Sequence, residues 1–181
     1  MHSLETKYLQ PGADGPGVVL GAGAVIDGYA SVFGVRDQGG DVVMPGAYAA
    51  SLARLKASGG KVRMLWQHDQ GQPIGVWDIV AEDGHGLRVK GRLLTEVERG
   101  REAAALMAAG AVDGLSIGYR TIRAEKLPEG GRKLIELELW EVSLVTFPML
   151  PVARVSAKAQ DAWLIAGFAE GIEAARLALR G

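Results

Sequence analysis

Three residue types that together can activate a serine occur in separate segments of the chain. Ser116 lies in an apolar, glycine-flanked segment, His68 follows a strand-like segment, and Glu141 lies where a later strand becomes apolar. A serine hydroxyl needs a base to take its proton, and an imidazole with a pKa near ~6.5 can do so at neutral pH. A carboxylate on the far ring nitrogen would hold the imidazole in the required tautomer. The set predicts acyl transfer through an activated serine.

Each of these residues also has an ordinary structural explanation. The Ser116 hydroxyl could be satisfied by backbone groups, His68 could be a packing or surface residue, and Glu141 could be the last exposed residue of its strand. His2 and His85 lie in an N-terminal arm and in a turn, so His68 is the histidine placed at the edge of a predicted strand. Residue types and spacing alone therefore leave the assignment open.

Composition argues against several other kinds of site. The chain has no cysteine, which removes thiol nucleophiles and thiolate metal ligands and suits a cytoplasmic protein. Three scattered histidines make a poor zinc site, and the turn at 39–41 lacks the downstream Gly-Lys-Ser/Thr of a phosphate loop. We expect neither a metal nor a cofactor. A formal net charge of -1 gives no overall positive field that would attract nucleic acid. No apolar stretch is long enough for a membrane helix.

The segments that must position these residues are mostly strands. The 26 glycines favour strands joined by tight corners. About seven strands are predicted, at 24–33, 42–44, 62–67, 73–80, 87–94, 115–123 and 134–147, with a short one near 18–20. Helices are predicted at 45–57, where Pro45 suits the first position, at 95–109, where Thr95 and Glu98 form a capping box, and at 158–180.

These elements predict an α+β protein that is mostly β, with the strands closed into a small barrel and about three surrounding helices. Residues 1–23 are expected to form a flexible N-terminal arm, and 24–155 the barrel domain. Residues 156–181 are expected to form a helix that packs on the barrel or serves in docking or dimerisation. No internal repeat is evident.

Five segments of the chain, taken in order, resemble the prohead (capsid maturation) proteases of tailed bacteriophages, which are similar to herpesvirus assembly proteases. The segments span roughly 24–155, and they are 28–34, 40–47, 65–69 with 73–75, 114–119 and 141–148. One segment would be weak evidence, whereas five in family order are specific. After Pro148 the chain departs from the Ala-Asn-Pro-x-Ala that phage relatives often carry, which affects only the local loop.

The resemblance implies a serine endopeptidase with a compact herpesvirus-protease-like barrel, and it assigns roles to the three residues. Ser116 would be the nucleophile, His68 the general base and Glu141 the third member, although the wider clan uses His, Asp or Glu there. The oxyanion donors stay open between a backbone N–H and Arg120.

The resemblance also implies partners and a location. The substrates would be the major capsid protein and the scaffold protein, cleaved inside an assembling procapsid in the bacterial host cytoplasm, with self-cleavage as well. A phage, a prophage and a gene-transfer particle are all compatible sources. Homodimerisation is left open. The alternative is a catalytically idle module of the same fold that binds scaffold or capsid protein during assembly.

Overall fold

The computed structural model describes residues 5–6, 19–21 and 23–148. All nine strands within these residues belong to one sheet, whose order is β1-β8-β9-β5-β6-β7-β3-β2, with β4 pairing separately with β9. The strands are β1 (Glu5–Thr6), β2 (Val19–Gly21), β3 (Val25–Val32), β4 (Val42–Val43), β5 (Arg63–Trp66), β6 (Asp69–Glu82), β7 (Gly86–Leu93), β8 (Gly114–Lys126) and β9 (Arg132–Val145).

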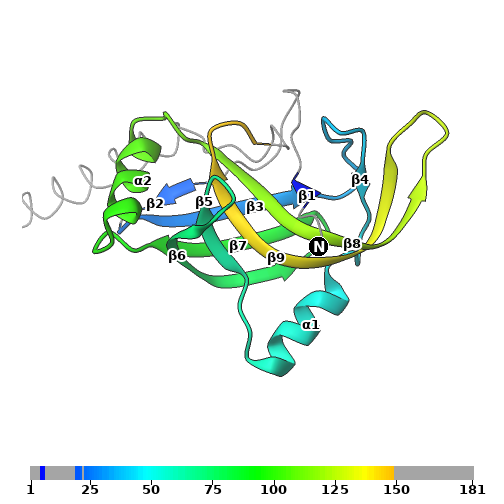
Figure 1. Cartoon of the computed structure of the whole chain (residues 1–181), viewed down its shortest axis with the longest axis horizontal. Coiled ribbons are helices and arrows are strands. Elements are labelled where there is room, and N and C mark those ends of the chain that lie inside the picture. Colours follow the sequence, from blue (N-terminus) through cyan, green and yellow to red (C-terminus); the bar gives the residue numbers. More distant parts are fainter. Residues whose placement is uncertain (1–4, 7–18, 22, 149–181) are drawn as a thin grey trace, which may run out of the picture.

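The sheet curls into a half-barrel, so the predicted mostly-β class is confirmed (Figure 1). Its hydrogen-bonded path begins at β1 and ends at β2, and no ladder in the described part of the chain joins these two strands. The predicted closure is therefore not confirmed. Each end of the path carries a short added strand, β1 on β8 and β2 on β3, and these strands occupy the edges that a closed barrel would pair with each other.

The short strands β1 and β2 come from 1–23, the segment predicted as an arm. The division into an arm, a barrel and a terminal helix stays a prediction. The predicted helix at 158–180 lies outside the described residues, which contain two helices.

The helix α1 (Ala49–Ser58) begins four residues later than Pro45, where the sequence predicted its start. Gly46 has a φ of +85°, in the left-handed region, and a right-handed helix cannot pass through that conformation. The predicted end is confirmed, because Gly59 adopts a left-handed φ of 67° and its backbone N–H donates to carbonyls of the last turn.

The helix α2 (Glu98–Ala108) also starts later than predicted, and the capping box is wrong. Val97 is the N-cap residue, and no side chain caps this end of the helix. The segment before it is a turn, in which the Val97 N–H donates to the Leu94 carbonyl at 3.0 Å. That turn places Thr95 outside the helix, so its hydroxyl does not have the position that a cap requires. No helix among the described residues has the length and hydropathy to cross a membrane.

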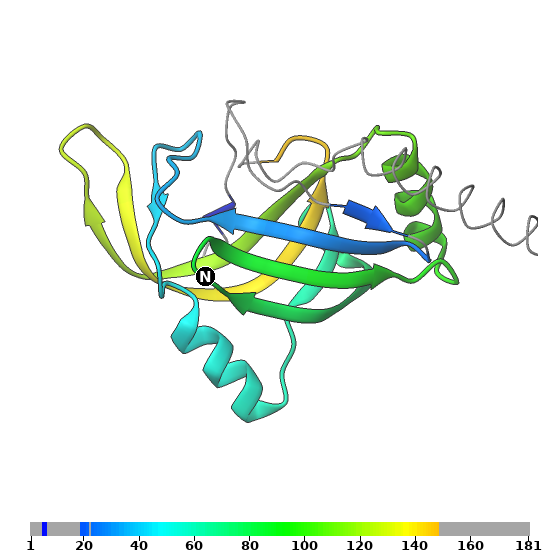
Figure 2. The ribbon, with the colours of Figure 1, turned by 180° about the vertical axis from the view of Figure 1, so that it is seen from behind.

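The helices and one long hairpin surround the curled sheet. In both views α2 lies at one end of the sheet, and the hairpin of β8 and β9 extends beyond the other end (Figures 1 and 2). The core is filled by apolar side chains from β3 to β9 and from α2, and Leu52 and Leu55 of α1 pack against it partly buried. Its largest fully buried members are Tyr48, Tyr119, Ile26, Met64, Ile74, Leu87, Leu115, Leu134, Leu137, Leu139 and Leu144.

Candidate active site

His68 lies in the two-residue turn that joins β5 to β6. Trp66 pairs with Asp69 across this turn, and the two residues between them, Gln67 and His68, have φ angles of 52° and 62°. Two successive positive φ angles are typical of the type I′ turn, which matches the twist of the strands it joins. A residue other than glycine is disfavoured there by about 1–2 kcal/mol. The turn must therefore be held by contacts with the rest of the protein.

The contacts that hold the turn come from β9, the strand beside β5. The Gln67 N–H donates to the Leu144 carbonyl at 2.9 Å. The Gln67 side-chain amide donates to the Thr146 hydroxyl at 2.7 Å. The His68 N–H donates to the Ser143 hydroxyl oxygen at 3.1 Å. Because β5 and β9 are parallel and in register here, these contacts place the imidazole over β9.

Ser116 lies near the start of β8, directly opposite Ser143 in the antiparallel ladder with β9. Side chains alternate between the two faces of a strand, and the neighbours Leu115 and Ile117 belong to the core. The Ser116 side chain therefore projects from the face opposite the core. The turn carrying His68 covers that face, and Ser116 is only 2% exposed.

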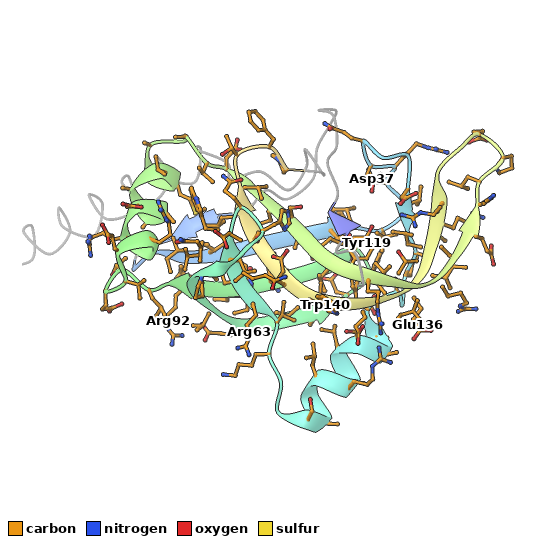
Figure 3. All side chains as sticks on the ribbon, in the orientation of Figure 1. Asp37, Arg63, Arg92, Tyr119, Glu136 and Trp140 are labelled. Atoms are coloured by element: carbon orange, nitrogen blue, oxygen red, sulfur yellow. The ribbon has the colours of Figure 1, made fainter. Side chains whose placement is uncertain are left out.

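A bulge in β9 places Glu141 on the same face as Ser116. Gly118 pairs with Glu141 and Tyr119 with Leu139, which leaves Trp140 without a partner in β8. Leu139 is a core residue, and strict alternation would direct Glu141 into the core as well. The extra residue reverses the alternation, so Glu141 instead faces the imidazole. Trp140 on β9 and Tyr119 on β8 are labelled in Figure 3.

The structure brings the three predicted side chains together in one chain of contacts. His68 Nε2 lies 2.9 Å from Ser116 Oγ, and His68 Nδ1 lies 2.5 Å from Glu141 Oε1. The side chains of His68 and Glu141 are 12% and 4% exposed, so the pair is largely shielded from solvent. This is the geometry in which an imidazole can take the proton of a hydroxyl while a carboxylate holds its other nitrogen.

Ser143 belongs to the same cluster, and the sequence reasoning gave it no role. Its hydroxyl donates to Glu141 Oε2 at 2.6 Å and accepts the backbone N–H of His68. The side chain is 0% exposed. The available signal was strand alternation, because two residues after Glu141 the side chain returns to the same face.

Gly118 leaves the space that the Glu141 carboxylate occupies, because glycine has no Cβ atom. A Cβ atom added at this position would lie 2.7 Å from Glu141 Cδ and closer still to Oε1. With Gly114 it brackets Ser116 in a Gly-x-Ser-x-Gly pattern, which in α/β-hydrolases marks a sharp strand-to-helix turn. Here the pattern runs inside β8, and Gly118 makes room for Glu141.

Arg120, considered from the sequence as an oxyanion donor, forms an ion pair with Glu138 at 2.7 Å across the β8–β9 ladder. The described side chains contain no group of three or more His, Asp or Glu residues arranged to hold a metal ion.

A cavity lies beside Ser116 between β3 and β8, and it has both apolar and acidic walls. The acidic wall is Asp37 and Asp41, whose loop precedes β4; Asp37 is labelled in Figure 3. Arg132 holds the Asp41 carboxylate through contacts of 2.7 and 3.1 Å to one of its oxygens. The apolar wall consists of Ala30, Val32, Val35, Val43, Leu115 and Ile117.

Comparisons with known proteins identify the family of the chain, one relative and one similar fold. A family model described as caudovirus prohead serine protease matches residues 18–164. The prohead protease of Enterobacteria phage HK97 is 34% identical over 140 residues, which is 76% of this chain and 61% of that protein. The chain thus spans less than two thirds of that relative's length. The capsid assembly protease gp21 of bacteriophage T4 has a similar fold, with a TM-score of 0.51 and 18% identity over 84% of this chain and 95% of that one.

Proposed function

Because the chain belongs to the caudovirus prohead serine protease family, as its five sequence segments indicated, we propose that it is a serine endopeptidase that acts in capsid maturation. The observation that carries the proposal is the continuous contact from Ser116 Oγ through the His68 ring to the Glu141 carboxylate. The name of the relative supports a role in capsid maturation, and the contacts among Ser116, His68 and Glu141 support catalysis by an activated serine.

In the proposed reaction Ser116 Oγ attacks the carbonyl carbon of the scissile peptide bond. His68 Nε2 takes the hydroxyl proton as the new O–C bond forms, and Glu141 stabilises the resulting imidazolium through Nδ1–H. The tetrahedral intermediate collapses when the C–N bond breaks, and His68 gives the proton to the leaving amine. Water then attacks the acyl-enzyme with His68 as base, and the acid product leaves as Ser116 recovers its proton.

We further propose that the substrates are the major capsid protein and the scaffold protein inside the procapsid, and that the enzyme also cleaves itself. Two relatives are named as a prohead protease and a capsid assembly protease, and these names support the substrate class. An enzyme enclosed with its substrates would act at high effective concentration. Homodimerisation, which the sequence left open, stays a prediction.

A serine-directed fluorophosphonate tests the proposal without a known cleavage site. It forms a bond between phosphorus and the serine oxygen and releases fluoride. We expect mass spectrometry to find the label on Ser116 and to find no label in Ser116→Ala. Ser51→Ala is the matched control, because Ser51 is equally buried and its hydroxyl accepts the Leu139 N–H instead of contacting a triad side chain.

Coexpression with the major capsid protein encoded in the same genome tests the substrate. We expect a shortened capsid protein with the wild type and with Ser51→Ala, and an intact one with Ser116→Ala. Normal processing by Ser116→Ala would refute the assignment. A wild type that neither labels nor processes would support the idle assembly module instead.

A further inference from the structure

One buried hydroxyl beside the triad contacts two of its members and takes no part in the reaction described above. Ser143 accepts the backbone N–H of His68 at 3.1 Å and donates to Glu141 Oε2 at 2.6 Å. It is 0% exposed and lies opposite Ser116 in the ladder between β8 and β9. It therefore lies between the backbone of His68 and the carboxylate of Glu141 and has no contact with solvent.

The directions of these two hydrogen bonds are set by the groups themselves. A backbone N–H can only donate, and an ionised carboxylate can only accept. A hydroxyl has one proton, so Ser143 accepts from His68 and donates to Glu141.

This direction continues through the rest of the cluster. Glu141 accepts at Oε2 from Ser143, and its other oxygen, Oε1, faces His68 Nδ1 at 2.5 Å. The proton of a neutral imidazole is then held on Nδ1, which leaves the lone pair of Nε2 directed at Ser116 Oγ, 2.9 Å away. The chain of hydrogen bonds thus begins at the backbone N–H of His68 and ends at the Ser116 hydroxyl, which must lose its proton.

The same hydroxyl also fixes the backbone that carries the base. Gln67 and His68 both have left-handed φ angles, a conformation that residues other than glycine seldom adopt without support. The His68 N–H donates to the Ser143 hydroxyl on β9. Without that acceptor a partly buried donor would be left unpaired at a position that is already disfavoured.

We propose that Ser143 is a positioning residue, which fixes both the backbone of His68 and the orientation of the Glu141 carboxylate through one hydroxyl. The proposal rests on the proposed function for its effect on catalysis. Its effect on the imidazole tautomer is independent of any activity, and the two can be measured separately.

The test compares Ser143→Ala with Ser143→Thr and with Ser51→Ala. Ser51 is a buried serine whose hydroxyl also accepts a backbone N–H of β9, that of Leu139 at 3.0 Å. Its substitution removes the same kind of contact from the same strand without removing a contact to a triad residue. Thermal melts establish that each variant is folded, and Ser143→Thr keeps the hydroxyl if the alanine variant is too unstable.

Two readouts are taken on each variant. The first is the ¹⁵N chemical shifts of the His68 ring nitrogens, which report the nitrogen that carries the proton. We expect a single Nδ1–H tautomer in the wild type, Ser143→Thr and Ser51→Ala, and a mixture of tautomers in Ser143→Ala. The second is the rate of fluorophosphonate labelling, which we expect to fall at least tenfold in Ser143→Ala only.

Wild-type tautomer and wild-type labelling rate in Ser143→Ala would overturn the inference and leave the proposed function intact. An unlabelled wild type, together with tautomer mixing in Ser143→Ala, would overturn the proposed function and leave the positioning role intact. Equal losses in Ser143→Ala and Ser51→Ala would show that only general stability had changed, and would also overturn it.

Discussion

Gly118→Ala tests whether the position of the Glu141 carboxylate controls the reactivity of the Ser116 hydroxyl. The added Cβ would lie 2.7 Å from Glu141 Cδ and 2.8 Å from Cγ. Ordinary contacts between carbon atoms are about 3.5–4.0 Å, so the carboxylate must move by about 1 Å. The backbone of Gly118 cannot easily yield, because it is paired with Glu141 on β9 and with Thr6 on β1.

The expected loss of activity follows from that displacement. A misplacement of about 1 Å can cost about 10²-fold in rate, and loss of the correct imidazole tautomer about 10⁴-fold. We therefore expect fluorophosphonate labelling of Ser116 to slow by about 10²- to 10⁴-fold in Gly118→Ala. Overpacking of this kind costs about 1–3 kcal/mol of stability, which should leave the protein folded.

The assay is the second-order labelling rate, with circular dichroism and a urea melt on the same samples. Gly84→Ala is the matched control, because a Cβ added there would meet nothing within 4 Å and its φ is not positive. A folded Gly118→Ala that labels within threefold of the wild type would refute the reasoning. It would mean that the carboxylate has another productive position or that Glu141 does not orient the base.

Two further predictions concern stability. Arg132→Met should lower the free energy of unfolding by about 1–3 kcal/mol in urea melts, because it removes the hydrogen bonds that the guanidinium donates to the Asp41 carboxylate, which is 8% exposed; an unchanged midpoint would contradict this. The hydrogen bond from the Tyr29 hydroxyl, followed by that from the His85 backbone N–H, lowers the pKa of Asp83 in the folded state. The carboxylate therefore contributes stability above its unfolded pKa, about 3.9, and loses it as the pH falls through the folded pKa. The melting temperature of Asp83→Asn should accordingly lie below the wild type at neutral pH and converge with it below about pH 4, whereas a gap independent of pH would contradict the linkage.

Much of the fold could be predicted from local patterns. The strands predicted at 24–33, 62–67 and 87–94 correspond to β3, β5 and β7 within one or two residues, because alternation and turn residues mark strands locally. The helix starts were less accurate, since a left-handed glycine at 46 and a turn before Val97 depend on the surrounding chain. The half-barrel shape depends on which edges pair, and pairing between distant segments leaves no periodic signal.

The sequence by itself determined that Ser116, His68 and Glu141 lie in three segments matching one family. Two features that assemble the site were decided only by the tertiary structure. The first is the bulge at Trp140, which reverses the alternation of side chains between the two faces of β9. Strict alternation would have directed Glu141 into the core.

The second feature is the turn at Gln67 and His68. Neither residue favours a positive φ, and their conformation depends on Leu144, Ser143 and Thr146, which lie more than 70 positions later in the chain. A local sequence pattern records the preferences of neighbouring residues. The left-handed turn and the role of Ser143 follow instead from long-range hydrogen bonds, which form only when β5 and β9 lie side by side.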